Sequence, residues 1–139
     1  MENQRIAPDW ITELKDNEVF IFGSNLAGRH GKGAAKQAMK WGAVYGQSFG
    51  LQGRTFAIPT VNASISNKLS LKKIQEYVDK FTVVAARYQH LTFLVTEIGC
   101  GLAGWDHKDI APMFLEAQKL QNVYLPKHFL RVLQHLDKD

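Results

Sequence analysis

Hydrophobic residues form four short and nearly continuous runs along the chain, each about as long as one strand. These runs cover residues 18–24, 55–60, 92–98 and 122–126, and turn-forming residues such as Gly, Ser, Asn and Pro flank them. A short apolar run that ends at a turn residue is typical of a strand that is buried on both faces. Pro59 is expected to lie near the end of the second strand, because proline cannot donate a hydrogen bond within a sheet.

Segments with helical periodicity separate these runs. From Leu71 to Tyr88 the apolar residues recur with i, i+3, i+4 spacing, and Ser70 is placed to cap the first turn. Another helix is expected to begin at about Asp109, with Pro112 in its first turn, where a backbone N–H has no partner within the helix. Shorter helices are expected over residues 34–42 and 127–136.

The alternation of strands and helices predicts an α/β fold with a mostly parallel sheet that helices cover on both faces. In such sheets the loops that follow the carboxyl ends of the strands bind ligands. Glycine-rich loops follow two of the predicted strands, at residues 25–33 and 99–104. If these strands are parallel, both loops lie at the same edge of the sheet.

The glycines in these loops are suited to binding an anion. Without a Cβ atom the backbone can adopt positive φ angles, and its N–H groups can approach a ligand closely. Successive N–H groups in such a loop bind phosphate groups. Arg29 and Lys32 could neutralise phosphate charge or could be ordinary solvated side chains. The alternative is that the glycines only shape tight turns between strand and helix.

Two common nucleotide motifs do not account for the loops. The first loop is not a P-loop, because Leu26 stands where that motif needs its first glycine and Gly33 stands where it needs a hydroxyl. The second loop matches G-x-G-x-x-G letter for letter, but a dinucleotide fingerprint opens its helix at once. Here residues 105–108 intervene, and too few residues follow Gly104 for the rest of a dinucleotide-binding domain.

Composition and charge limit the remaining classes of protein. The 139 residues, 45% hydrophobic and 22% charged, are expected to form one domain, 1–139. No apolar segment has the pattern of a secretory signal or the length of a membrane span, so no membrane partner is expected. Cys100 is the single cysteine, which predicts a reducing, cytoplasmic environment. The net charge of +4 would attract a phosphate-bearing ligand, but the basic residues are scattered, so nucleic acid is not the expected main partner.

The segments F22-G-S-N25, L-A-G-R-H-G-K-G33 and I98-G-C-G-L-A-G-W105 together resemble the macro domain. In that family a strand ends in an asparagine, a glycine-rich loop begins the next helix, and a second glycine-rich loop cradles a diphosphate. The resemblance, which covers residues 18–120, implies a three-layer α/β/α sandwich with a mostly parallel mixed sheet. It also implies a nucleotide ligand, ADP-ribose or a related nucleotide diphosphate. Two functions stay open: an ADP-ribosyl hydrolase, and a non-enzymatic module that senses a nucleotide or binds nucleic acid.

The resemblance also implies roles for individual residues. Asn25 would contact the distal ribose and would be the candidate catalytic residue, by positioning water and substrate. Trp105 would stand beside that ribose, and Asp9, in D9-W-I-T12, would be the counterpart of the aspartate that selects adenine. The other ligand-binding candidates belong to the two loops and the strand ends before them: Gly23, Ser24, Gly28, Arg29, His30, Gly31, Lys32, Gly33, Ile98, Gly99, Cys100, Gly101, Leu102, Ala103 and Gly104.

Four polar residues also have a simpler structural interpretation. Asn25 could form an Asx turn with its own backbone, and His30 is expected to be an exposed loop residue rather than a general base. Cys100 is expected to pack under a turn, because the sequence places no base beside it. Glu97 is expected to be solvated or paired. No group of Cys, His, Asp and Glu residues has the spacing of metal ligands, so neither a metal ion nor a cofactor is expected.

Overall fold

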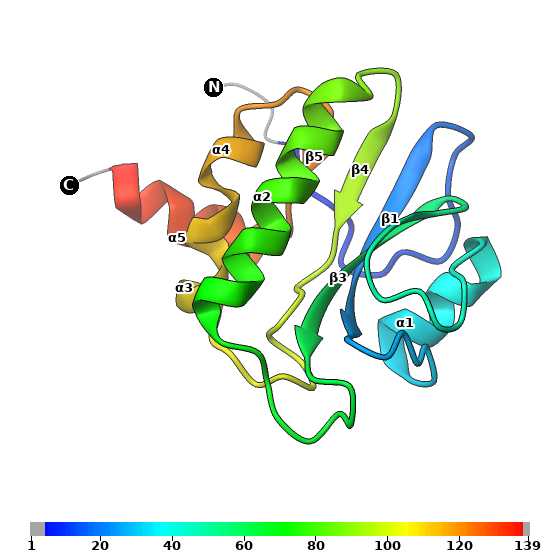
Figure 1. Cartoon of the computed structure of the whole chain (residues 1–139). Coiled ribbons are helices and arrows are strands. Elements are labelled where there is room, and N and C mark those ends of the chain that lie inside the picture. Colours follow the sequence, from blue (N-terminus) through cyan, green and yellow to red (C-terminus); the bar gives the residue numbers. More distant parts are fainter. Residues whose placement is uncertain (1–4, 138–139) are drawn as a thin grey trace.

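A five-stranded sheet lies at the centre of the computed structural model, which describes residues 5–137 (Figure 1). The strand order is β2-β3-β1-β4-β5. β1, β3, β4 and β5 are parallel, and β2 pairs antiparallel with β3. The strands are β1 (Glu18–Asn25), β2 (Gly50–Gln52), β3 (Thr55–Val61), β4 (Thr92–Val95) and β5 (Val123–Tyr124). The predicted α/β fold with a mostly parallel mixed sheet is confirmed.

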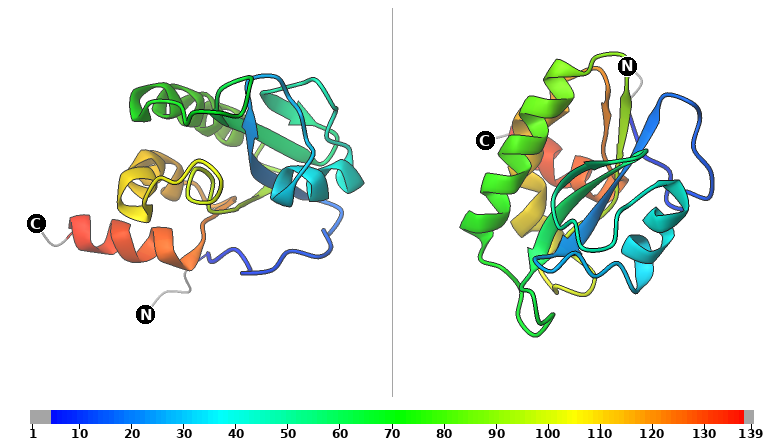
Figure 2. Two further views of the ribbon diagram at one scale, coloured as in Figure 1. Left: turned by 90° about the horizontal axis from the view of Figure 1, so that it is seen from below. Right: turned by 45° about the vertical axis from the view of Figure 1, so that its right-hand side comes forward.

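Helices cover both faces of the sheet and make three layers (Figure 2). On one face lie α2 (Leu71–Arg87), α3 (His107–Ile110), the 3-10 turn η2 (Ala111–Phe114), α4 (Leu115–Gln118) and α5 (Lys127–Asp137). The other face is covered by α1 (Gly33–Ala38), the 3-10 turn η1 (Met39–Trp41) and the segment around Ile11. Among the described helices, none combines the length and the apolar character needed to cross a membrane.

Each central strand contributes to two hydrophobic cores, because alternate side chains point to opposite faces of the sheet. In β1, Val19 and Ile21 face the larger core under α2 and α5, whereas Phe20 and Phe22 face the smaller core under α1. All four side chains are buried. Burial on both faces explains why the strands appear in the sequence as continuous apolar runs rather than alternating ones.

The predicted helix at 71–88 is confirmed to within one residue as α2. Its N-cap is Ser70, whose hydroxyl accepts a hydrogen bond from the N–H of Lys73 at 3.1 Å. This helix covers β3 on the side of the larger core (Figure 1). The packing of α2 thereby supports the strand whose carboxyl end forms part of the cleft described below.

The helix expected from Asp109 is instead divided into three short pieces, α3, η2 and α4. It begins earlier, at His107, because Asp106 and Asp109 form a capping box in which each side chain accepts a hydrogen bond from the backbone near the other. Pro112 then lies at the start of the 3-10 turn η2 rather than in the first turn of a long helix. Proline removes a helical hydrogen bond, so the α-helix does not continue through it.

The strand predictions also need correction: β4 and β5 are shorter than predicted, with β5 limited to Val123–Tyr124, and β2 was missed. β4 ends at Val95 rather than at residue 98, because the N–H of Ile98 donates to the carbonyl of Thr96 at 2.8 Å in a tight turn. β2 was not predicted, since it has three residues and its central side chain, Leu51, is exposed, so no apolar pattern marks it. The early end of β4 places Thr96 and Glu97 beyond the sheet, at its carboxyl edge.

Candidate functional site

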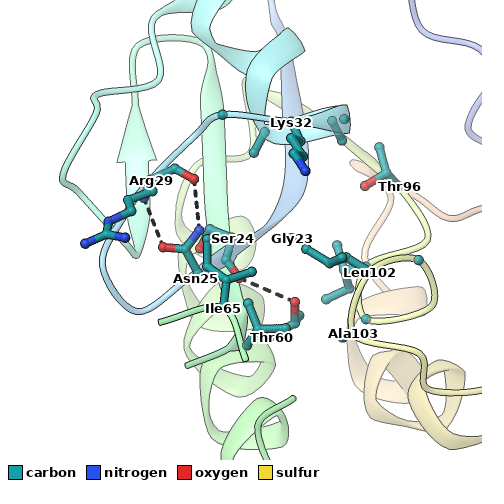
Figure 3. A pocket seen from close by; sticks show the side chains of 18 of the residues that line it. Gly23, Ser24, Asn25, Arg29, Lys32, Thr60, Ile65, Thr96, Leu102 and Ala103 are labelled. Carbon is teal, nitrogen blue, oxygen red and sulfur yellow. Dashed lines mark hydrogen bonds between the residues drawn. The ribbon is translucent and has the colours of Figure 1, made fainter. Parts of the chain in front are cut away.

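A cleft of about 780 Å³ lies at the carboxyl edge of the sheet (Figure 3). The ends of β1 and β3 line it, together with the first loop (residues 25–33) and the second loop (residues 99–104). The two loops face each other across Gly23 and Ser24 in Figure 3. The prediction that both glycine-rich loops meet at one edge of the sheet is therefore confirmed.

The side chain of Asn25 holds the first loop in place. Its Oδ1 accepts hydrogen bonds from the N–H groups of Ala27 at 3.1 Å and Arg29 at 2.9 Å, and its Nδ2 donates to the carbonyl of Arg29 at 2.9 Å. The Asn25 residue is buried, with 5% of its surface exposed. Both ends of the amide are engaged by the loop backbone, which is the Asx-type arrangement that asparagine favours. Direct contact between Asn25 and a ligand stays a prediction.

Gly28 allows the first loop to pass close to the backbone at residues 46 and 47. Its φ angle is +69°, and an added Cβ would lie 2.5 Å from the carbonyl carbon of Gly46 and 2.6 Å from the nitrogen of Gln47. The N–H of Gly46 donates to the carbonyl of Gly28 at 2.8 Å, which joins the two segments. Glycine is needed here both for the backbone conformation and for this close approach.

The part of the first loop that faces the cleft has free backbone donors. Within residues 5–137, the N–H groups of Gly31, Lys32 and Gly33 donate to no protein acceptor. A Cβ added at Gly31 or Gly33 would meet nothing within 4 Å, so open space adjoins this backbone. The Arg29 and Lys32 side chains also line the cleft. The first loop therefore offers both N–H donors and positive charge to an anion.

The second loop is a compact turn that also exposes its backbone to the cleft. Gly99 and Gly104 have φ angles of +75° and +80°, and the N–H of Trp105 donates to the carbonyl of Gly99 at 2.8 Å. Gly101 and Leu102 lie at its tip, and Leu102 is 77% exposed. Gly99 and Gly101 line the cleft together with Ile98, Leu102 and Ala103.

Six of the predicted ligand-binding residues do not line this cleft: Asp9, Gly28, His30, Cys100, Gly104 and Trp105. His30 is buried, with 3% of its surface exposed, so the expectation of an exposed loop residue is wrong. Its ring packs edge-on against Phe22, with 5.2 Å between the ring centroids. The cause is the course of the first loop, which turns this side chain inward onto the smaller core.

Trp105 does not line the cleft and packs against the segment before α2. Its indole Nε1 donates to the carbonyl of Leu69 at 3.1 Å, and the ammonium of Lys68 lies 3.7 Å from the ring centroid in a cation–π contact. These contacts join the second loop to the segment before α2. The predicted role of Trp105 beside a ribose stays untested by this arrangement.

Asp9 lines a smaller cavity of about 430 Å³ that adjoins the main cleft. Its carboxylate pairs with the ammonium of Lys127 at 3.1 Å. Trp10 also lines this cavity and is 87% exposed, a large apolar surface beside the charged pair. Thr96 and Glu97 border both cavities, so the two form neighbouring parts of one edge of the molecule.

Two ionisable side chains in the segment that follows β4, Glu97 and Cys100, have shifted pKa values. Burial, with smaller contributions from Glu97, Asp106 and Asp109, raises the pKa of the Cys100 thiol to about 12, so the thiol is neutral and poorly nucleophilic near pH 7. Burial also raises the pKa of Glu97, but hydrogen bonds from His128 and His107 outweigh it and leave the pKa below its ordinary value. Glu97 is therefore ionised at neutral pH and paired, one of the two roles expected for it.

Several side chains that line the cleft were not among the predicted residues. Tyr45 comes from the loop after η1, Thr60 from β3, Ile65 from the loop after β3, and Thr96 from the turn after β4. Ile65 has a φ angle of +60°, which is uncommon for a β-branched residue. Their position at or after strand ends was a usable signal for Thr60 and Thr96, but no local pattern marks Tyr45 or Ile65.

Two solved structures have the same fold. The macrodomain of Mycobacterium tuberculosis DarG matches with a TM-score of 0.63 and 21% sequence identity, over 87% of this chain and 94% of that chain. A protein of unknown function from Bacteroides thetaiotaomicron matches with a TM-score of 0.63 and 16% identity, over 91% of this chain and 98% of that chain. No protein-family model matches the sequence, and no curated protein matches it. The chain has a macro-domain-like fold, as its two loop motifs predicted.

Proposed function

We propose that the chain binds ADP-ribose or a related nucleotide diphosphate in the cleft between the two loops. The observation that carries this proposal is that both glycine-rich loops line one cleft of about 780 Å³. Small-molecule sites in proteins have volumes of about 300–1,000 Å³. The macro-domain-like fold supports the same class of ligand, because the resemblance to the macro domain implies that the second loop cradles a diphosphate.

The diphosphate would lie between the loops. A phosphate oxygen would accept hydrogen bonds from the free N–H groups of Gly31, Lys32 and Gly33. Gly31 and Gly33 have no Cβ atom that would obstruct its approach. The Arg29 and Lys32 side chains would offset part of its negative charge. Across the cleft, the tip of the second loop at Gly101 would close over the other side of the diphosphate.

The adenine end would lie in the smaller cavity, where Trp10 and Asp9 are. This cavity adjoins the main cleft at Thr96 and Glu97, so a single extended nucleotide would occupy both. The exposed indole of Trp10 provides a flat apolar surface on which a base stacks. The ion pair between Asp9 and Lys127 would have to loosen for the Asp9 carboxylate to accept a hydrogen bond from the base.

Calorimetric titration with ADP-ribose, ADP, AMP and NAD tests the proposal. We expect ADP-ribose and ADP to bind, and AMP to bind at least about tenfold more weakly, because a loss of about 1.4 kcal/mol accompanies the missing phosphate. The absence of heat with all four ligands at millimolar concentration would refute nucleotide binding. Equal affinity for ADP and AMP would refute the assignment of the loops to the diphosphate.

Gly31→Ala and Gly101→Ala are expected to weaken ADP-ribose binding by about tenfold without changing thermal stability. An added Cβ meets no protein atom within 4 Å at either position, and neither residue has a positive φ angle, so the fold tolerates it. The methyl group would project from loop backbone that lines the cleft and would hold the ligand away from the N–H groups. Melting curves and calorimetry on the same samples check this. Unchanged affinity in both variants would contradict the proposed diphosphate position.

Trp10→Ala is expected to weaken ADP-ribose binding by about fivefold, since base–aromatic stacking contributes about 1–3 kcal/mol per base and an exposed site lies at the low end. Trp10→Phe, which keeps an aromatic face, is the matched control and should retain most of the affinity. Ribose 5-phosphate, which has no base, should bind both variants and the wild type alike. An equal loss for ribose 5-phosphate would contradict the placement of adenine at Trp10.

Binding, rather than hydrolysis, is the function that the cleft supports best. The Cys100 thiol, with a pKa of about 12, is a poor nucleophile, and the amide of Asn25, the residue that would position water, is already engaged by the backbone of its own loop. Binding of the diphosphate needs only the two loops. Incubation with an ADP-ribosylated protein separates the two functions: release of ADP-ribose identifies a hydrolase, whereas binding without release identifies a module that senses or retains the nucleotide.

A further inference from the structure

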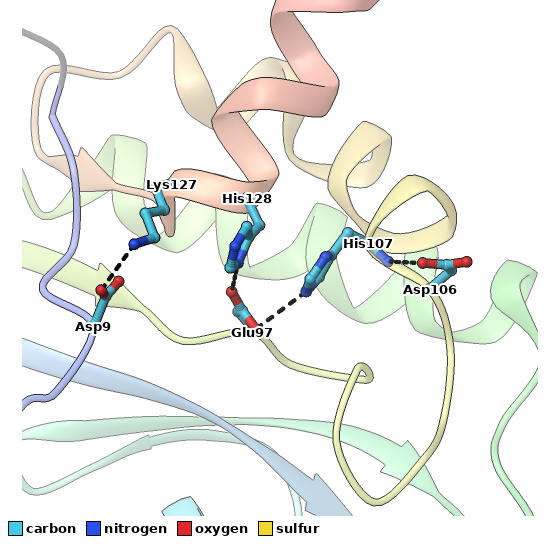
Figure 4. A network of polar contacts seen from close by, with 6 residues as sticks. All are labelled: Asp9, Glu97, Asp106, His107, Lys127 and His128. Carbon is cyan, nitrogen blue, oxygen red and sulfur yellow. Dashed lines mark hydrogen bonds and ion pairs between the residues drawn. The ribbon is translucent and has the colours of Figure 1, made fainter.

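Three side chains from separate elements meet beside the cleft (Figure 4). Glu97 follows β4, His107 is the first residue of α3, and His128 lies in the first turn of α5. The Glu97 Oε1 atom lies 3.1 Å from Nε2 of His107, and its Oε2 atom lies 2.6 Å from Nδ1 of His128. The carboxylate thus brings one nitrogen of each imidazole toward the same place.

The spacing of these atoms suits a metal ion. The three potential ligand atoms all lie within 4.8 Å of one another. Zinc–nitrogen and zinc–oxygen bonds of about 2.0–2.2 Å in a tetrahedral site separate neighbouring ligand atoms by about 3.3 Å. The two imidazole rings are stacked, with 4.7 Å between centroids and 12° between planes, so the rings would have to turn relative to each other for both nitrogen lone pairs to point at one ion.

We propose that Glu97, His107 and His128 form a binding site for one divalent transition-metal ion, with Zn²⁺ as the ion that best fits these ligands. Imidazole is a borderline ligand and carboxylate a harder one; zinc binds both, and two imidazoles with one carboxylate leave one tetrahedral position for water or another oxygen. Glu97 and His128 also line the smaller cavity, so this position opens toward it. The three ligands lie outside the two loops proposed to bind the diphosphate, but Glu97 and His128 line the smaller cavity proposed for adenine, so a bound ion would adjoin the base.

The surroundings favour a cation and allow it to enter. The side chains of Glu97, His107 and His128 are 39%, 34% and 40% exposed. Asp106, the N-cap of α3, adds negative charge next to His107. The other nearby carboxylate, Asp9, is already paired with Lys127, so it is not counted as a ligand. The three ligands join the end of β4 to the starts of α3 and α5, and an ion would strengthen that junction.

Zinc binding is measured on the full chain after removal of metal with a chelator. Competition with a chromophoric zinc indicator should show one Zn²⁺ bound per chain. Thermal melting should shift upward with added Zn²⁺, because an ion that binds the folded state stabilises it. No competition by the wild-type protein at micromolar concentrations would overturn the proposal.

Matched variants assign the site. His107→Ala and His128→Ala should each weaken zinc binding by at least about tenfold, and Glu97→Gln should have a similar effect, because each removes one of three ligands. His135→Ala removes an exposed histidine from the same helix as His128 and should leave zinc binding unchanged. Equal affinity in wild type, His107→Ala and His128→Ala would overturn the assignment.

A measurement on the wild type alone keeps the test independent of how the variants fold. Crystals soaked in Zn²⁺ should give one anomalous-scattering peak between Glu97, His107 and His128. A peak elsewhere, or none there at full soak, would overturn the site. Calorimetry with ADP-ribose on the metal-free protein then tests the nucleotide proposal separately, because the two loops proposed to bind the diphosphate contain none of the three metal ligands.

Discussion

Gly28→Ala is expected to lower the free energy of unfolding by about 2–5 kcal/mol and the melting temperature by roughly 10 °C. Two effects add. A non-glycine residue in the left-handed region costs about 1–2 kcal/mol, and Gly28 has a φ angle of +69°. The added Cβ would also lie 2.5 Å from the carbonyl carbon of Gly46, a backbone atom that cannot rotate away. Forced repacking of this kind costs about 1–3 kcal/mol more.

Two other glycines of the same loop separate these effects. Gly33 has a φ angle of +57° but open space around its Cβ position, so Gly33→Ala should show the conformational cost alone, about 1–2 kcal/mol. Gly31 has neither constraint and should show almost no change. Chemical denaturation measures the free energy of unfolding of the three variants. Equal stability of Gly28→Ala and Gly33→Ala would show that the first loop does not pack against residues 46 and 47.

Gly28→Ala should also weaken ADP-ribose binding, although Gly28 does not line the cleft. The contact with residues 46 and 47 fixes the course of the first loop, and a displaced loop carries Arg29 and the N–H donors that follow it away from the ligand. Calorimetry at a temperature where the variant is still folded is the measurement. Unchanged affinity would mean that the ligand does not depend on the first loop.

Asn25→Ala is expected to cost about 2–3 kcal/mol of stability and at least tenfold in ADP-ribose affinity. Three hydrogen bonds between the amide and the loop backbone are lost, each contributing about 0.5–1.5 kcal/mol. The loop then has to be ordered when the ligand binds, which lowers the affinity. Melting curves and calorimetry check the two effects together. A stable variant that loses only affinity would show that Asn25 acts as a ligand contact rather than as the support of the loop.

Asn25→Asp is the matched control. A carboxylate of the same shape still accepts from the N–H groups of Ala27 and Arg29 but cannot donate to the carbonyl of Arg29. We expect a stability loss of more than about 1 kcal/mol, because a buried carboxylate oxygen would replace the donor that lies 2.9 Å from the Arg29 carbonyl oxygen. Affinity for a diphosphate should nevertheless fall, because the new negative charge adjoins the cleft. If the amide only organises the loop, a hydrolase activity would fall in step with binding in both variants.

Local periodicity was sufficient for most of the fold and for the location of the cleft. The spacing of apolar residues along α2 follows from the helical repeat, and its Ser70 cap follows from local hydrogen bonding. The continuous apolar runs predicted the parallel strands, and parallel strands alone require that the loops after Asn25 and after Ile98 share an edge. These features depend on residues that are close in the chain or on a general rule of sheet topology.

Features that depend on residues far apart in the chain were not predictable in this way. Glu97 is 10 residues from His107 and 31 from His128, so no spacing rule groups them; the ends of β4, α3 and α5 meet because the helices pack on the sheet. His30 is buried because its loop turns inward against Phe22, although its sequence neighbours are polar and glycine residues.

The sequence by itself determined the order of elements, the class of fold and the two glycine-rich loops at one edge of the sheet, because backbone propensities and side-chain periodicity act over a few residues. The tertiary structure decided which loop residues face the cleft, that the Asn25 amide is engaged by its own loop, and which ionisable side chains meet. The physical reason is that side-chain direction and contact depend on how separate elements pack, and that packing is a property of the whole chain.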